Sequence, residues 1–246
     1  MTRFPLFILF SLILVVACGS VPESRRSRAV IKRIKPKLEK ELIAKGLQFG
    51  SPVFMRIFKD SKELEIWIRK DSEFVLFKIY PIHYFSGTPG PKLKEGDRQA
   101  PEGFYFVTPS RMNPNSRYHL SFNLGYPNKY DRAHGRTGSA LMVHGNTGSV
   151  GCFAMTDARI EEIYTLADGA LRGGQKFFRV HSFPFKMTEK NMMQRKGRAW
   201  YDFWANLKEG YDFFEKTKMP PNVTVVNKRY VFKQKRKKRK PDEQRI

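Results

Sequence analysis

The sequence predicts a mostly β fold with flanking helices, in the α+β class. Three observations predict it. Short segments rich in β-branched and aromatic residues recur through the middle of the chain, which is typical of strands. Longer segments with apolar residues three and four positions apart flank them, which is typical of helices. The 246 residues, 41% hydrophobic and 14% aromatic, suffice for one or two domains and exclude wholesale disorder.

The first element, residues 1–18, resembles an export signal. Arg3 precedes the uncharged apolar run Phe4–Ala17, which is shorter than the roughly 20 residues of a membrane-spanning helix. Val15-Val16-Ala17-Cys18 resembles a bacterial lipobox, which implies cleavage before Cys18 and a lipid on its sulfur. The alternative is an ordinary signal peptide with Cys18 incidental. The expected location is the periplasm, with a lipid anchor, in the outer membrane if the cell is Gram-negative.

Residues 19–49 are predicted to form a basic tether and a short helix. Residues 21–34 are polar and rich in Arg, which is typical of a linker. Pro36 is suited to a first helical turn and Gly46 to a helix end, so the helix is expected over Pro36–Lys45.

Residues 50–185 carry the strand patterns, interrupted by a loop rich in Gly and Pro at 87–103. A helix with Thr156 as its N-cap is expected up to Gly173-Gly174. Residues 186–232 are predicted as a helical extension, because an aromatic stripe runs through 188–216. Strands are expected at 53–58, 64–69, 73–80, 104–108, 118–122, 140–144 and 176–181.

The formal net charge of +23 is concentrated at the two ends. Residues 1–40 hold nine basic and two acidic side chains, and residues 233–246 hold eight and two. Residues 233–246 are therefore predicted to be a basic disordered tail. Basic ends favour an anionic partner such as a membrane surface. Nucleic acid is not expected as a partner, because an exported protein meets little of it.

The chemistry is concentrated between His144 and Cys152. If Cys18 is lipidated or removed, Cys152 has no intramolecular partner, and a lone thiol in an exported protein is either buried and inert or kept for chemistry. An imidazole beside a thiol can make it a nucleophile. Backbone N–H groups of Val150, Gly151 and Cys152 are candidates to stabilise an oxyanion. The alternative is a buried Cys near a His by chance.

These residues resemble the L,D-transpeptidase catalytic domain (YkuD type), which acts on peptidoglycan stem peptides. The resemblance rests on His144-Gly145 before Ser149-Val150-Gly151-Cys152, and it extends over about 50–185. Longer shared strings resemble the YafK-like branch of the family: 90–100, 112–116, 130–138 and 151–157. The fold implied is a β-sandwich-like catalytic domain with a C-terminal helical extension.

The resemblance implies a two-step acyl transfer through a thioester, with Cys152 as nucleophile, His144 as base and the backbone carbonyl of Gly145 orienting the imidazole. The sequence departs from the family pattern in three ways. Only eight positions separate His144 from Cys152, Val150 replaces a His, and Phe153-Ala154-Met155 replaces a segment containing Arg. The expected reaction is therefore release of covalently attached lipoprotein from murein, an amidase activity of the YafK-like branch. The alternative is an L,D-transpeptidase that forms cross-links or attaches protein.

Four further residues are candidates to hold the stem peptide: Asp97, Arg132, His134 and Arg136. For Ser86 and Lys92, hydrogen bonding within loops is the favoured role. No metal or other cofactor is expected, because the five His are scattered and the two Cys are assigned to the lipobox and to the nucleophile. A second functional class is a non-catalytic wall-binding lipoprotein, which the His–Cys pair disfavours.

Overall fold

The computed structural model describes residues 20–233. The predicted export signal with Cys18, and the tail beyond Lys233, lie outside this range. The described residues form a mixed α+β fold. Its helices are α1 Arg25–Ile43, α2 Lys129–Ala133, α3 Asp157–Arg172, α4 Glu189–Met193 and α5 Tyr201–Thr217. Its strands are β1 Val53–Phe58, β2 Glu63–Lys70, β3 Glu73–Pro81, β4 Gly103–Val107, β5 Met112–Asn113, β6 Ser121–Asn123, β7 Met142–His144, β8 Phe153–Ala154, β9 Phe178–Phe183, β10 Asn222–Val226 and β11 Arg229–Lys233.

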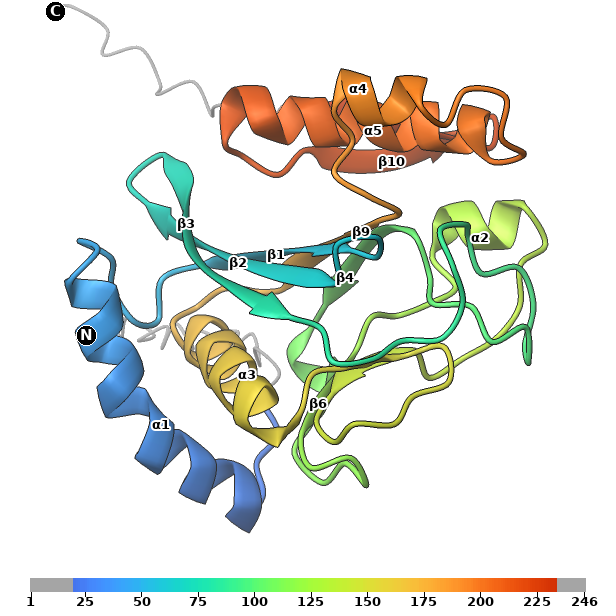
Figure 1. Cartoon of the computed structure of the whole chain (residues 1–246). Coiled ribbons are helices and arrows are strands. Elements are labelled where there is room, and N and C mark those ends of the chain that lie inside the picture. The colour runs from blue at the N-terminus through green and yellow to red at the C-terminus, as the bar shows by residue number, and fades with distance from the viewer. Residues whose placement is uncertain (1–19, 234–246) are drawn as a thin grey trace, which may run out of the picture.

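The larger sheet has five strands in the order β3-β2-β1-β9-β4. Strand β1 runs parallel to β9, and the other neighbours are antiparallel. The sheet lies between α3 on one face and α4, α5 and the β10–β11 hairpin on the other (Figure 1). Every residue of β1 is buried, because both faces of this central strand are covered.

The smaller sheet has four strands in the order β5-β6-β7-β8. Its apolar face carries Phe122, Val143 and Phe153, which are fully buried in the main core together with Ile160 and Ile163 of α3. Strands β7 and β8 are parallel and hydrogen-bonded to each other. All seven predicted strands have a counterpart in one of the two sheets, although the one expected at 118–122 is reduced to β6.

Helix α1 differs from the prediction, because it begins at Arg25 instead of Pro36. Ser24 is the N-cap, and its side chain accepts a hydrogen bond from the Ser27 N–H at 3.0 Å. Such a cap contributes about 1 kcal/mol. The buried face packs against α3 and consists of Ser27, Val30, Ile34, Leu38 and Leu42.

The polar residues that suggested a tether form the outer face of α1. Arg33 and Lys37 pair with Glu161 and Glu162 of α3, each at 2.7 Å. Pro36 lies inside the helix with its side chain exposed. Its missing N–H removes one backbone hydrogen bond, but tertiary packing on both sides of it preserves the helix.

The C-terminal region holds helices, as predicted, and also the unexpected hairpin β10–β11. The region predicted as a helical extension, 186–232, thus contains two helices and a hairpin that the sequence did not predict. Arg56 of β1 is buried under α5, where it bonds Glu65 at 2.7 Å and Glu215 at 2.6 Å. Its guanidinium lies 4.9 Å from the ring centroids of Trp67 and Phe214. This region is thus tied to the centre of the larger sheet.

The long loop before β4 is anchored by a buried ion pair. Lys59 and Glu102 have 0% side-chain exposure and lie 2.9 Å apart. Lys59 also donates to the carbonyls of Gly90 and Ala100, and Glu102 accepts from the indole N–H of Trp204 in α5 at 3.0 Å. One charged pair therefore connects the loop, the end of β1 and α5.

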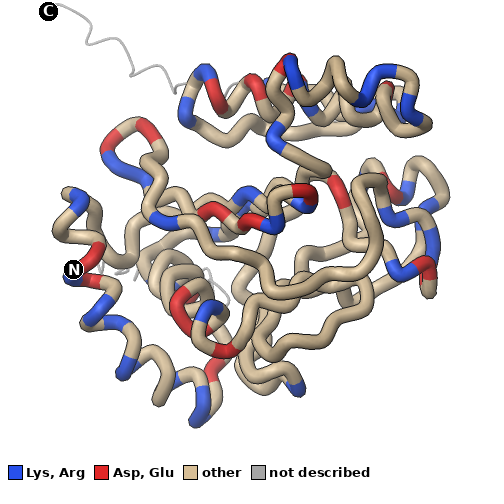
Figure 2. Tube along the Cα trace, in the orientation of Figure 1, with Lys and Arg blue, Asp and Glu red and all other residues tan. Residues whose placement is uncertain are grey.

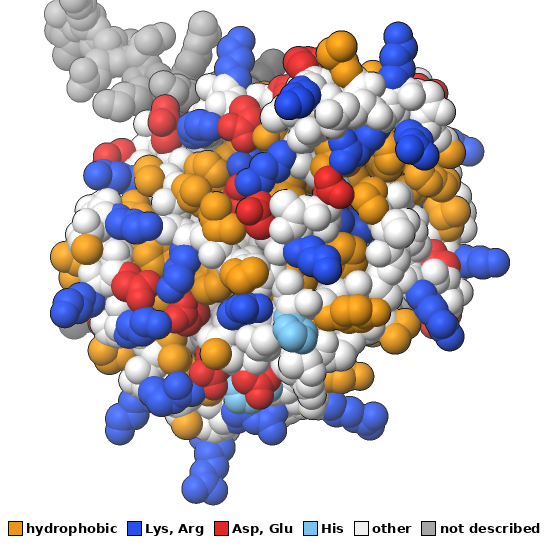
Figure 3. All heavy atoms as spheres, in the orientation of Figure 1, with side chains coloured by type: hydrophobic (Ala, Val, Ile, Leu, Met, Phe, Trp, Pro, Cys, Tyr) orange, Lys and Arg blue, Asp and Glu red, His pale blue; other side chains and the backbone are white. Residues whose placement is uncertain are grey.

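Basic residues are spread widely over the surface. Figure 2 shows Lys and Arg along α1 and on the C-terminal helices, and Figure 3 shows basic side chains over the whole of the face in view. Among residues 20–233, no helix is long and apolar enough to span a membrane.

Candidate active site

The pairing of β7 with β8 brings His144 and Cys152 together. The parallel register places Val143 beside Phe153 and His144 beside Ala154. Side chains alternate between the two faces of a sheet, so Val143 and Phe153 enter the core while His144 lies on the opposite face. Cys152 directly precedes β8 and takes the same side as His144. Both side chains line one cavity of about 280 Å³.

The imidazole of His144 is held in one tautomer. Its Nδ1 lies 2.6 Å from the carbonyl oxygen of Gly145. A carbonyl can only accept, so Nδ1 carries the proton and Nε2 keeps its lone pair. The Tyr118 ring covers the imidazole, with centroids 4.6 Å apart. Burial lowers the pKa of His144 below its ordinary value of 6.5, against a smaller opposing effect of the Gly145 carbonyl. The resting imidazole is therefore a neutral base.

Gly145 is closely confined. A side-chain Cβ at this position would lie 2.5 Å from the Asp157 carboxylate and 2.8 Å from the Tyr118 carbonyl. The same Asp157 oxygen accepts a hydrogen bond from the Asn146 N–H at 2.7 Å. The start of α3 thus fixes the loop that carries the carbonyl partner of His144.

The thiol of Cys152 is half-buried. Its sulfur accepts a hydrogen bond from the Met142 N–H at 3.3 Å and lies 3.5 Å from the Ala140 carbonyl. Burial raises the pKa of the Cys152 thiol, while the Met142 N–H and the charge of Lys92 act in the opposite direction. The resting pair is therefore a neutral thiol and a neutral imidazole in the same cavity, and the thiol must transfer a proton to form the nucleophile.

The expected oxyanion donors are only partly available. The Gly151 N–H, one of the predicted oxyanion donors, donates to the Ser86 hydroxyl at 2.7 Å in this structure. Gly151 has a φ of +82°, in the left-handed region that favours glycine. Within residues 20–233, the N–H groups of Val150 and Cys152 have no acceptor. These two amides remain the candidate donors.

The four substrate-binding candidates are not brought to this cavity. Arg136 is buried against Asp131 at 2.9 Å, and its guanidinium lies 4.9 Å from the Phe203 ring centroid. His134 stacks on Tyr130, and Arg132 donates to the Pro127 carbonyl.

Asp97 accepts a hydrogen bond from Lys92 Nζ at 2.6 Å and others from three backbone N–H groups of its own loop. All four candidates thus make contacts that stabilise the fold, because charged residues near a catalytic motif also serve loop and core structure. Lys92 has the loop role that the sequence predicts.

Five further residues form the rest of the cavity wall, and of these the sequence singles out Ser149 and the exposed Val150 but not Tyr118, Asn146 or Gly148. The Ser149 hydroxyl oxygen is buried and has no partner among the described residues. An aromatic residue before β6 carries no sequence signal of its own, so only the pairing of β6 with β7 reveals its position. Within residues 20–233, no three His, Cys, Asp or Glu side chains lie close enough to hold a metal ion.

The chain was compared with protein families and with known proteins, and both comparisons found matches that include the candidate site. The family model for the L,D-transpeptidase catalytic domain (YkuD) matches residues 57–226. The chain is 47% identical to a protein named putative L,D-transpeptidase YafK from Escherichia coli, over 182 residues, covering 74% of each chain.

Two solved structures are also similar to the chain. One is a mutant of the helical cell shape determining protein Pgp2 from Campylobacter jejuni, with 21% identity and a TM-score of 0.44 over 78% of this chain and 65% of that one. The other is Bd1075 of Bdellovibrio bacteriovorus, with 20% identity and a TM-score of 0.38 over 67% and 62%. The match spans less than two thirds of each of these two solved chains.

Proposed function

The chain belongs to the L,D-transpeptidase catalytic domain family, and from this premise we propose that it is a cysteine acyl-transfer enzyme that releases covalently attached lipoprotein from murein. The observation that carries the chemistry is the shared cavity of Cys152 and His144, with the imidazole held as a base by the Gly145 carbonyl. The likeness to the YafK relative supports the choice of branch.

In the first step, His144 Nε2 takes the thiol proton and the Cys152 sulfur attacks a carbonyl carbon. The target is the carbonyl on the L-centre of diaminopimelate in the stem peptide. The negative charge that develops on its oxygen is stabilised by backbone N–H groups, for which Val150 and Cys152 are the candidates. The C–N bond then breaks, and the imidazolium returns its proton to the departing lysine amine of the lipoprotein.

In the second step, water is the nucleophile and displaces the Cys152 sulfur from the thioester. His144 removes a proton from water, the oxygen attacks the thioester carbon, and the C–S bond breaks with return of the proton to sulfur. The products are a free lipoprotein and a tripeptide stem that ends in a carboxylate. If an amine takes the place of water, the same thioester yields a cross-link. That reaction is the transpeptidase alternative.

The choice of water as acceptor rests on the sequence departures around the cavity. Val150, 69% exposed, stands where the family pattern has a histidine. This apolar side chain provides no base or hydrogen-bond donor for positioning a second amine. Two observations therefore support water as the acceptor. One is the short loop between His144 and Cys152 with its composition, and the other is the resemblance to the YafK-like branch.

The test uses purified residues 19–246 with two substrates. One is sacculi that carry covalently bound lipoprotein, and the other is tetrapeptide muropeptides with an amine acceptor. Mass spectrometry should detect released lipoprotein and tripeptide stems, with little cross-linking. Cys152→Ala and His144→Ala should each reduce the rate by at least about a thousandfold, because neither group forms the thioester alone.

His134→Ala is the matched control, because it removes an exposed histidine outside the cavity and should leave the rate unchanged. Cross-linked products with lipoprotein still attached would favour the transpeptidase. No change in either substrate, together with a Cys152 that does not react with thiol reagents, would favour the non-catalytic wall-binding lipoprotein.

A further inference from the structure

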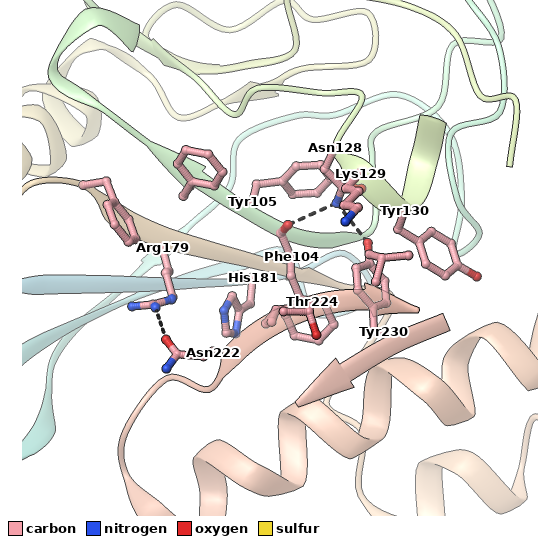
Figure 4. A pocket seen from close by; sticks show the side chains of 14 residues that line it. Phe104, Tyr105, Asn128, Lys129, Tyr130, Arg179, His181, Asn222, Thr224 and Tyr230 are labelled. Carbon is pink, nitrogen blue, oxygen red and sulfur yellow. Dashed lines mark hydrogen bonds between the residues drawn. The ribbon is translucent and has the colours of Figure 1, made fainter. Parts of the chain in front are cut away.

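A second pocket lies between the larger sheet and the C-terminal hairpin. Its walls come from β4, β9, α2 and the two strands β10 and β11 (Figure 4). Its volume is about 290 Å³, close to the lower end of small-molecule pockets, which is about 300 Å³. It shares no residue with the cavity at Cys152. The reaction proposed above does not use it.

The pocket is lined mainly by aromatic and aliphatic side chains. Phe106 and Phe177 are 44% and 37% exposed, and their ring centroids are 5.5 Å apart. Exposed aromatic rings at a pocket suit the apolar face of a ring or chain. The full set of aromatic lining residues is Phe104, Tyr105, Phe106, Tyr130, Phe177 and Tyr230.

The charged side chains in the lining are both cationic, Lys129 and Arg179. Figure 4 shows Arg179 pointing toward Asn222, to whose Oδ1 it donates a hydrogen bond at 2.8 Å. Among residues 20–233 no acidic side chain forms an ion pair with Arg179, whose contacts are Asn222 and the Phe177 ring, with its centroid 5.2 Å from the guanidinium carbon. Burial lowers the pKa of this guanidinium. A partly desolvated cation without a counter-ion is costly, and a bound anion would offset that cost.

His181 is another polar side chain in the pocket wall. It is 1% exposed, lines the pocket, and neither ring nitrogen has a hydrogen-bond partner among the described residues. Its ring centroid lies 4.7 Å from that of Phe54 and 4.7 Å from that of Phe104. A neutral imidazole offers one donor and one acceptor. A hydroxyl or an amide group in the pocket would satisfy either one.

We propose that this pocket binds a small organic carboxylate with an apolar body and a hydroxyl or amide group. The carboxylate would meet Arg179, the apolar body would contact Phe106 and Phe177, and the hydroxyl or amide would meet His181. If murein is the substrate, as in the proposed function, two of its parts have this chemistry. One is an N-acetylmuramic acid from which the stem has been removed, since its carboxyl is otherwise amide-bonded, and the other is the L-alanyl-D-glutamate unit that begins the stem, whose α-carboxylate is free. Either would give the enzyme a second contact with the polymer.

The test measures binding by calorimetry to residues 19–246 carrying Cys152→Ala, which removes turnover. The probes are N-acetylmuramic acid, the dipeptide L-alanyl-D-glutamate with its γ-carboxyl amidated as in the stem, and neutral N-acetylglucosamine. At least one acidic probe should bind with a dissociation constant below about 1 mM, and the neutral sugar should bind at least about tenfold more weakly. The stronger acidic probe identifies the source of the carboxylate.

Variants connect the binding to this pocket. Arg179→Met should weaken the acidic probe about tenfold or more, because a charge-assisted contact is lost. Arg229→Met removes the same charge from an exposed position on the hairpin and should leave the affinity unchanged. His181→Phe keeps an aromatic ring but removes both nitrogens, and it should also weaken binding.

The proposal is overturned if no acidic probe binds, if the neutral sugar binds equally well, or if Arg229→Met weakens binding as much as Arg179→Met. These outcomes are separate from those of the proposed function. Lipoprotein release without probe binding would remove the pocket proposal alone. Probe binding without any Cys152-dependent turnover would remove the proposed reaction and leave the pocket.

Discussion

Ser86 is the residue that controls the backbone next to the candidate nucleophile. Its hydroxyl accepts the Gly151 N–H, and its own carbonyl accepts the Ala100 N–H at 3.2 Å. The bond from the Gly151 N–H to the Ser86 hydroxyl fixes the Val150–Gly151 peptide, which lies one peptide before the one that leads into Cys152. The loop before β4 thereby sets the position of the sulfur, although no Ser86 atom lines the cavity.

We therefore expect Ser86→Ala to lower kcat by about tenfold to a hundredfold, because the Val150–Gly151 peptide, close to Cys152 in the chain, loses its fixed orientation. KM and the melting temperature should change little, since the residue neither lines the cavity nor belongs to the core. Ser86→Thr should restore most of the rate. Ser61→Ala, at an exposed turn, is the control. An unchanged kcat in Ser86→Ala would show that the bond has no positioning role.

The directions of the two pKa shifts predict the pH profile. Burial moves the pKa of His144 below 6.5, so the base stays neutral and active until the pH falls below that value. Burial moves the pKa of Cys152 above 9.0, so the free thiol does not ionise by itself near neutral pH.

The acid limb of kcat/KM should therefore lie below that of an ordinary histidine, with no alkaline limb up to about pH 9. Rate measurements from about pH 4 to about pH 9 provide the test, and alkylation of Cys152 should rise steeply only at high pH. An acid limb at or above 6.5 would contradict the expected burial of His144.

At the scale of elements, patterns of local periodicity were predictable and long-range pairings were not. The strands β1, β2 and β3 were predicted almost to their ends, because adjacent β-rich segments pair with each other. The short strands β5 and β8 have two residues each and exist only because β6 and β7 lie beside them. Such strands carry no periodic signal.

In α1 and in the candidate site, too, local features were predictable from the sequence and contacts between distant segments were not. The polar residues of α1 suggested a tether because their acidic partners lie in α3, far along the chain. The His144–Cys152 pair was predictable because one short loop joins the two residues. The roles of Ser86, Tyr118 and Arg136 depend on contacts between distant segments, and they could not be read from local sequence.

Helix α1 should contribute to the stability of the whole fold. Leu38 has 0% exposure between α1 and α3. We expect Leu38→Ala to lower the free energy of unfolding by about 3 kcal/mol, from lost burial and the cavity left behind. Urea unfolding of residues 19–246 measures this. Lys40→Ala, on the exposed side, should change it by less than about 0.5 kcal/mol. Equal effects of the two substitutions would mean that α1 does not pack on α3 in solution.

At the scale of the whole molecule, the proposed anchor and the fold are close together in sequence. Ser24, the N-cap of α1, follows Cys18 by six positions. If Cys18 carries a lipid, the folded domain lies near the membrane surface, and its basic outer face contacts anionic headgroups.

We expect Cys18→Ser to release the protein from the membrane fraction or to block its processing. Mass spectrometry of the mature N-terminus, together with cell fractionation, provides the measurement. Cys152→Ser should leave both results unchanged and serves as the control. An unlipidated mature N-terminus in the unsubstituted protein, together with processing and membrane fractionation that do not change in Cys18→Ser, would contradict the anchor.

The buried pair Lys59–Glu102 couples local unfolding of α5 to local unfolding of the loop before β4. Glu102 receives the indole N–H of Trp204, and Lys59 holds the loop that reaches Ser86. Local opening of α5 would leave this carboxylate short of a donor in an apolar interior, so α5 and the loop cannot open independently at low free energy. Amide protons in the two segments should therefore exchange with solvent as one cooperative unit. A protease that nicks the chain near Trp204 would then inactivate Cys152 without touching the cavity that contains it.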